Sequence, residues 1–330
     1  MAFVIDSSEW NFDNWPPELI VEKLENILER IHIALERSEN VWFGEELQNK
    51  EILQGHDLWS LRSEDSPLTL PPEIWEELAA WLGRGKCYLD EDWPDNFPEH
   101  SVTHLDNLSI PENMDIDWAH HNTLSGNPVA CLSLNRNGIY TTQSNSGSID
   151  IHWITSETDA LKFWRSAIDI QGDNDQSLEN LSAHAYPYLY FHSEIWHGIH
   201  RLTGGYHANR NKIKKHLATL NDFGEWAFTA PPPALSPQEP RGESTERPSN
   251  QIIERRFHGL NITMAPENPN VFRNSRCRAA REITIQSRKI YCEWHAKIEP
   301  HTNRIHVYPP IQESNNRLII AIIDAHLELP

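Results

Sequence analysis

The stretch that decides the fold of the last part of this chain reads Cys292-Glu293-Trp294-His295-Ala296-Lys297-Ile298, and Arg304-Ile305-His306-Val307-Tyr308 follows it. Both runs alternate between polar and apolar side chains, which is typical of half-buried β-strands. The residues between them, 299–303, have the composition of a hairpin loop. If the two strands pair antiparallel, the polar face of the sheet carries Glu293, His295, Lys297, Arg304, His306 and Tyr308.

This polar face has the groups needed for acid–base chemistry on an anionic substrate. An imidazole changes its protonation near neutral pH, which suits His295 or His306 to the role of general base. Lysine and arginine stabilise the charge that develops on a phosphate without a metal ion. The alternative is an ordinary solvated face, on which Glu293 and Lys297 form ion pairs and both histidines have only a structural role.

The neighbouring segments complete a small predicted α+β module at residues 251–330. Residues 272–283 favour a helix, whereas residues 283–290 favour a strand because they are β-branched and alternate with polar residues. Residues 317–323 form a mainly aliphatic run, which is typical of a central strand buried on both faces. Asp324, His326 and Glu328 follow at its end.

A small antiparallel sheet preceded by a helix, with basic and imidazole side chains on one face, resembles the RelE/ParE-type toxin fold. The resemblance covers about the last 75 residues. It implies a metal-independent ribonuclease of the kind found in toxin–antitoxin and antiphage-defence systems, with RNA or the ribosome as the partner of residues 251–330.

The same resemblance implies roles for eight side chains. His295 or His306 would be the general base, and Glu293 would orient it or replace it. Cations would stabilise the pentavalent phosphate, namely Lys297, Arg304 and Arg317. A proton for the leaving 5′-oxygen would come from Tyr308 or His326.

The charge of the chain is divided unevenly along its 330 residues. Residues 1–120 hold 7 Lys and Arg against 27 Asp and Glu, whereas residues 251–330 hold 11 against 8, within a net charge of −20. So acidic a chain repels nucleic acid as a whole, but its last segment can approach phosphates. The acidic first third is either a solvated surface or a module that masks the basic face or binds a basic protein partner.

The chain is predicted to have an α+β fold in four parts. Residues 1–120 are expected to be acidic and mainly helical, with helices over residues 17–39 and from residue 72. Residues 121–229 are expected to form an α+β region, with a β-meander at 129–134, 139–142 and 149–154 and a helix at 158–168. Residues 230–250 are Pro-rich and are interpreted as an extended or flexible linker to the module at 251–330.

Two further segments carry histidines or cations. His197 and His200 would share a face of a helix, which favours packing over a zinc site because no third ligand is set by local spacing. Residues 209–216 form a basic cluster, Asn209-Arg210-Asn211-Lys212-Ile213-Lys214-Lys215-His216. We interpret it as a solvated helix face, with contact to RNA or to an acidic partner as the alternative.

Several functional classes lack their motifs. The four cysteines, at 87, 131, 277 and 292, form no C-x-x-C pair, and the sequence has neither a P-loop nor G-x-G-x-x-G. Met1–Trp10 contains Asp6 and Glu9, unlike a signal peptide, and no apolar run is long enough to span a bilayer. The expectations are a cytoplasmic location, no membrane contact, no cofactor and no metal ion.

Three functional hypotheses follow. The first is the metal-independent ribonuclease, restrained by the acidic N-terminal region. The second is a metal-dependent nuclease with a divalent ion among Glu293, His295, His306 and Asp324. The third is a regulatory protein without catalysis, whose acidic N-terminal region binds a basic partner.

Overall fold

The protein consists of two compact units, residues 1–171 and 172–330. The computed structural model describes residues 2–63, 65–88, 104–105, 108–109, 113–240 and 245–330. Helices and strands are mixed in both units, which confirms the predicted α+β class. No helix in the described ranges is long and apolar enough to cross a membrane.

The first unit is built around an eight-stranded sheet with the order β5-β2-β1-β8-β10-β9-β6-β7. Five strands run parallel, and β9, β6 and β7 are antiparallel to their neighbours. The strands are β1 (Ala2–Ile5), β2 (Asn40–Phe43), β5 (Lys86–Cys87), β6 (His104–Leu105), β7 (Leu108–Ser109), β8 (Ala130–Leu132), β9 (Gly138–Ser144) and β10 (Gly147–Ile154). A small separate hairpin is formed by β3 (Glu51–Leu53) and β4 (His56–Asp57).

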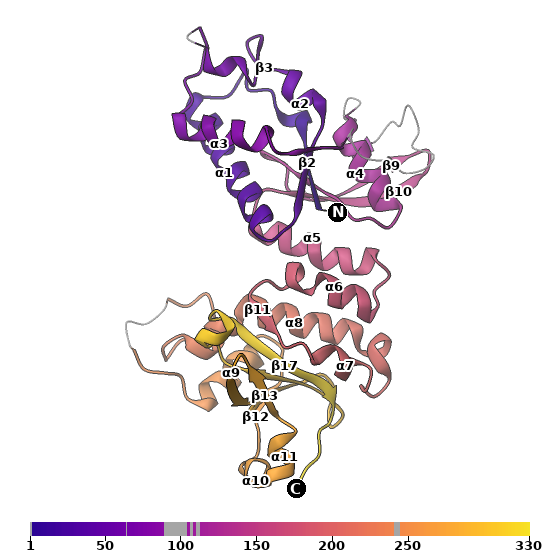
Figure 1. Cartoon of the computed structure of the whole chain (residues 1–330), viewed down its shortest axis with the longest axis vertical. Coiled ribbons are helices and arrows are strands. Elements are labelled where there is room, and N and C mark those ends of the chain that lie inside the picture. The colour runs from indigo at the N-terminus through magenta and orange to yellow at the C-terminus, as the bar shows by residue number, and fades with distance from the viewer. Residues whose placement is uncertain (1, 64, 89–103, 106–107, 110–112, 241–244) are drawn as a thin grey trace. The chain divides into compact units, whose positions relative to one another are not determined.

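Helices cover both faces of this sheet. They are α1 (Pro17–Glu36), α2 (Glu45–Asn49), α3 (Pro72–Leu82), α4 (Met114–Leu124) and α5 (Glu157–Ile170). Successive residues of a strand point to opposite faces: Phe3 packs on Phe163 and Trp164 of α5, and Val4 belongs to a core cluster with Trp118 of α4. Helix α1 lies against β2 and α3 (Figure 1). The predicted helices at 17–39, from 72 and at 158–168 are therefore confirmed.

The second unit contains a five-stranded sheet with the order β11-β17-β16-β15-β12. Its strands are β11 (Leu189–Phe191), β12 (Met264–Pro266), β15 (Trp294–Lys297), β16 (Asn303–Tyr308) and β17 (Leu318–Ala325), and only β11 and β17 pair in parallel. The single strand predicted at 283–290 is instead a hairpin of β13 (Glu282–Ile285) and β14 (Arg288–Tyr291), and the predicted helix at 272–283 is replaced by shorter helices. Short helices α10 (Pro269–Arg273) and α11 (Ser275–Ala279) precede the hairpin.

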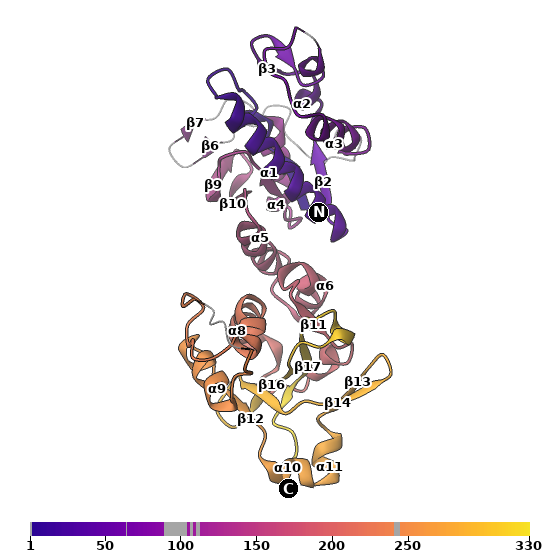
Figure 2. The same ribbon diagram turned by 90° about the vertical axis from the view of Figure 1, so that its left-hand side faces the viewer.

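Helices pack on one face of this sheet and the β13–β14 hairpin packs on the other (Figure 2). Besides α10 and α11, the helices of the unit are α6 (Asp175–Ala185), α7 (Ile195–Ile199), α8 (Gly205–Thr229) and α9 (Asn250–Gly259). Trp294 of β15 contacts Phe228 of α8, which in turn contacts Phe257 of α9. On the other face, Ile283 and Ile290 of the hairpin pack with Ile319 of β17.

The boundary between the units differs from the predicted linker. It falls at residue 171, inside the region expected at 121–229, and the Pro-rich segment belongs to the second unit. The fully buried guanidinium of Arg256 explains why: it donates to the carbonyl oxygens of Ala227, Ala230, Pro231 and Ala234 at 2.8–3.2 Å. These bonds fasten residues 230–234 to α9. Of the predicted linker, residues 241–244 lie outside the described ranges.

The predicted β-meander also differs from the observed topology. Strands β9 and β10 form the expected antiparallel hairpin, but β8 pairs in parallel with β10 rather than with β9. Strand β8 also pairs with β1, so it belongs to the parallel centre of the sheet. The region expected to be mainly helical, residues 1–120, thus supplies β1, β2, β5, β6 and β7 to the same sheet.

Candidate functional site

The two alternating runs pair as antiparallel strands, as their patterns predict. In the register of β15 and β16, His295 lies opposite His306, and Lys297 lies opposite Arg304. The two imidazole rings are 5.6 Å apart between centroids. Local sequence therefore brings the two histidines together through strand register alone.

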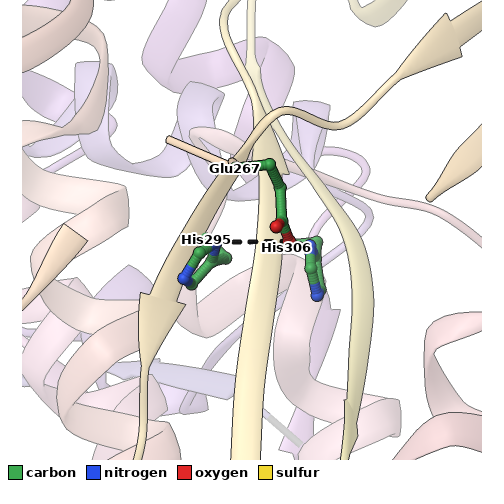
Figure 3. Close-up of side chains that lie close together, drawn as sticks. All are labelled: Glu267, His295 and His306. Carbon is green, nitrogen blue, oxygen red and sulfur yellow. Dashed lines mark ion pairs between the residues drawn. The ribbon is translucent and has the colours of Figure 1, made fainter. Parts of the chain in front are cut away.

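A carboxylate joins the two histidines from a third strand. Glu267 directly follows β12, which pairs with β15 on the side away from β16, and its N–H donates to the carbonyl oxygen of Glu293 at 2.6 Å. Its Oε1 lies 3.4 Å from Nδ1 of His295 and 3.7 Å from Nδ1 of His306 (Figure 3). The three side chains form what we call the Glu–His–His cluster, whose facing atoms all lie within 4.8 Å of one another.

Arg281 fixes the carboxylate of this cluster. Its Nε donates to Oε1 of Glu267 at 2.7 Å, and its Nη1 donates to the carbonyl oxygens of Cys277 and Glu328. Burial alone would raise the pKa of Glu267, but the contacts with His295 and Arg281 outweigh burial and lower that pKa to about 2. Glu267 is therefore a carboxylate at any physiological pH.

His306 is buried without hydrogen bonds. Its residue is only 1% exposed, and neither ring nitrogen has a hydrogen-bond partner among the described residues. Burial, and next the neighbouring His295, lower the pKa of His306 to about 3. The imidazole is neutral at pH 7, so one of its nitrogens carries a free lone pair.

A basic pocket of about 450 Å³ begins at the next pair of residues along the same strands. Lys297 and Arg304 line it together with Lys212, Lys215, His216 and His301, and no carboxylate is among its described lining residues. Lys212 is paired with Glu299, and Nη1 of the buried Arg304 donates to the carbonyl oxygens of Glu299 and Asn303. Residues two apart on a strand share a face and lie about 7 Å apart. Lys297 and Arg304 are thus the next pair along the strands after His295 and His306. Lys212, Lys215 and His216 come from α8, which packs on the face of Trp294, opposite the face that carries His295.

Four of the sequence-predicted site residues lie outside this group. Glu293 lies in the link between β14 and β15, before the paired residues of β15, and it is exposed. It lines a different pocket with Tyr308, which also packs against the isoleucine cluster under the β13–β14 hairpin. Arg317 and His326 are exposed at the two ends of β17.

The other histidines and acids singled out in the sequence are used elsewhere. His197 contacts Glu194 and His200 contacts Asp175, so the pair forms no shared site in the described chain. Asp324 accepts a hydrogen bond from Nε of Arg201 at 2.8 Å. Neither Glu293 nor Asp324 belongs to the Glu–His–His cluster, so the predicted metal ligand set is corrected to Glu267, His295 and His306.

A second group of acids lies in the first unit, just after β1. Asp6 accepts from Arg136 at 2.7 Å and from the indole N–H of Trp153 at 2.8 Å. Asp115 accepts from the backbone of Ser7 at 2.9 Å and from the hydroxyl of Tyr88 at 2.8 Å, and burial raises its pKa to about 6. Both carboxylates are satisfied by internal donors, in contrast to the lone pairs of His306.

Sequence reasoning missed Glu267 and Arg281. Glu267 follows Met-Ala-Pro at 264–266 without any spacing that relates it to His295. Only the pairing of β12 with β15 brings it to the cluster. Comparisons with protein-family models, with curated proteins and with solved structures found no match for this chain.

Proposed function

We propose that the second unit is a nuclease that acts on RNA. The observation that carries this proposal is the sequence of pairs along β15 and β16, in which His295–His306 is followed directly by Lys297–Arg304 at the basic pocket. Backbone phosphates of RNA would bind to the cations of the pocket. The Glu–His–His cluster would then act on the neighbouring phosphodiester.

Cleavage would begin with attack of a ribose 2′-hydroxyl on the adjacent phosphorus. A bond forms between O2′ and phosphorus, the bond from phosphorus to O5′ breaks, and the products are a 2′,3′-cyclic phosphate and a 5′-hydroxyl end. The proton of the 2′-hydroxyl must pass to a base, and the leaving oxygen must gain a proton. His295 is the most exposed member of the cluster, and its contact with Glu267 orients it for the role of base.

We revise the roles implied by the toxin resemblance to fit the contacts of these side chains. Glu267 takes the orienting role that Glu293 was expected to have, because it is Glu267 that contacts His295. Lys297 and Arg304 keep their proposed role toward phosphate, now with Lys212 and Lys215 of α8. Restraint by the acidic first part of the chain stays a proposal, supported by a net charge of −21 over residues 1–171 against +1 over residues 172–330.

The test is cleavage of single-stranded RNA by the full chain, with analysis of the product ends. We expect cyclic phosphate ends, no cleavage of DNA because it lacks the 2′-hydroxyl, and a loss of at least tenfold in kcat for His295→Ala. Lys215→Gln with Lys297→Gln should raise KM at least tenfold because phosphate contacts are lost. His197→Ala and Lys162→Gln, both at exposed positions away from the pocket lining, are matched controls.

The proposal is contradicted if neither the folded full chain nor the folded unit of residues 172–330 cuts RNA, with or without added Zn²⁺, Mn²⁺ or Mg²⁺. Such a result would favour the third hypothesis, binding of a basic partner by the first unit. That hypothesis rests on the −21 charge of residues 1–171 and requires that deletion of residues 172–330 leave the binding intact.

A further inference from the structure

We propose that Glu267, His295 and His306 bind one divalent transition-metal ion, with Zn²⁺ as the preferred occupant. Any catalytic use of this ion rests on the proposed nuclease function, but its binding does not. With the ion bound, His295 would be a ligand, and the role of base would pass from His295 to a water molecule on the ion. The ligands come from β15, from β16 and from the residue that follows β12, so the ion would tie three adjacent strands together.

The spacing of the three side chains fits a shared cation. Two atoms bound to one zinc ion at about 2.0–2.2 Å in tetrahedral geometry lie about 3.4 Å apart. Oε1 of Glu267 is 3.4 Å from Nδ1 of His295 and 3.7 Å from Nδ1 of His306. Small rotations of the side chains are therefore enough to place all three donors around one ion.

The second, independent observation is the lack of partners for His306. A buried polar atom without a hydrogen bond is costly, and buried imidazoles normally have partners. Here both nitrogens of His306 and Nδ1 of His295 lack a hydrogen bond among the described residues, and Nδ1 of each ring faces the carboxylate of Glu267. A cation between them would satisfy the lone pairs of both rings and the carboxylate at once.

Arg281 would act as a positioning residue for this site. It holds Oε1 of Glu267 with one hydrogen bond, and a carboxylate has two oxygens and about four acceptor directions. The carboxylate can therefore serve Arg281 and the ion together. Fixed second partners of this kind are a general feature of metal ligands.

The chemistry of the donors selects the type of metal. Two imidazoles and one carboxylate suit Zn²⁺ and its transition-metal neighbours, whereas Mg²⁺ and Ca²⁺ prefer all-oxygen sites. Three protein ligands also leave a fourth tetrahedral position for a water molecule or a substrate oxygen. The buried setting of His306 and Glu267 excludes most competing water from the ion.

The experiment titrates the metal-free full chain with Zn²⁺ alone and, for spectroscopy, with Co²⁺. We expect one equivalent to bind, a higher melting temperature, and tetrahedral Co²⁺ absorption. His306→Gln and His295→Gln should each lower the affinity at least tenfold, whereas His197→Gln should not change it. Glu267→Gln is the poorer probe because it also removes the charged partner of Arg281.

Two further measurements keep the outcome unambiguous. His295→Cys keeps a ligand at this position, so it should retain the metal and gain a thiolate-to-cobalt absorption band that wild type lacks, which a folding defect cannot produce. The proposal is overturned if wild type binds no stoichiometric Zn²⁺ or Co²⁺, or if the His306→Gln and His295→Gln variants bind as well as wild type. Metal binding without RNA cleavage would refute the proposed nuclease and support the metal site. RNA cleavage that resists EDTA, in a chain that binds no metal, would support the nuclease and refute the metal site.

Discussion

At the scale of single residues, two buried histidines differ in what surrounds them. His120 in α4 is fully buried, and its ring nitrogens lie 2.7 Å from the hydroxyl of Thr142 and 2.9 Å from that of Ser144. His306 is equally buried but has no such partners in the described chain. The first is a satisfied structural histidine, and the contrast is the reason for assigning a ligand role to the second.

The buried imidazole of His120 should make the free energy of unfolding depend on pH. Burial, and next the nearby His121, lower its pKa from 6.5 to about 4. Above pH 6.5, His120 is neutral in both the folded and the unfolded chain. As the pH falls toward 4, the unfolded chain binds a proton that the folded chain does not, so the free energy of unfolding decreases. This lowering of the pKa by about 2.5 units corresponds to a loss of roughly 3 kcal/mol in the free energy of unfolding at low pH.

Urea unfolding of wild type and His120→Gln between pH 7.5 and 4.5 checks this expectation. The difference in unfolding free energy between them should shrink by about 2–3 kcal/mol on acidification. Asp115, whose raised pKa acts in the opposite direction, contributes equally to both proteins and cancels. His32→Gln, at an exposed site on α1, is the control, and a pH-independent difference for His120→Gln would contradict the argument.

At the scale of elements, one close contact fixes α7 against β17. A Cβ atom at Gly198 would lie 2.0 Å from the carbonyl oxygen of Ile323, which is backbone and cannot move aside as a side chain would. Gly198→Ala should therefore push α7 away from the sheet and cost about 1–3 kcal/mol of stability. Thermal unfolding measures the effect.

The matched control for this change is Gly259→Ala at the end of α9. A Cβ there meets no atom within 4 Å, so this variant should be neutral or more stable by about 0.4–1 kcal/mol. Equal melting temperatures for the two variants would show that α7 does not depend on close approach to β17.

At the scale of the whole molecule, the unit that can fold is larger than the module expected at 251–330. That segment supplies four of the five strands of the second sheet, but β11 and α8 come from residues before it. Without α8, the contact between Phe228 and Trp294 is lost and the face of the sheet under α8 is exposed. Lys212 and Lys215 of the basic pocket are lost as well.

Residues 172–330 are accordingly expected to fold and unfold cooperatively, whereas residues 251–330 should aggregate or lack fixed tertiary structure. Near-UV circular dichroism and the dispersion of NMR amide signals distinguish the two states. Residues 1–171 serve as the companion fragment. A stable, well-dispersed fragment 251–330 would contradict the assignment of β11 and α8 to the same cooperative unit.

The sequence by itself determined the helices and strands whose apolar residues recur at a regular spacing within one short segment. The stripe of α1, the alternation of 294–297 and 304–308, and the aliphatic run of β17 are all encoded within a few neighbouring residues. A short loop then sets the pairing of His295 with His306. The two histidines of the candidate site can therefore be predicted from the sequence of one hairpin.

Only the tertiary structure decided which distant segments meet. Glu267 reaches the histidines through the pairing of β12 with β15, and β8 pairs with β1 across more than 100 residues of chain. Arg256 turns a Pro-rich segment into part of the second unit by binding its carbonyl oxygens. No local period encodes such contacts, because they depend on the packing of the whole unit and on single polar groups that find their partners only there.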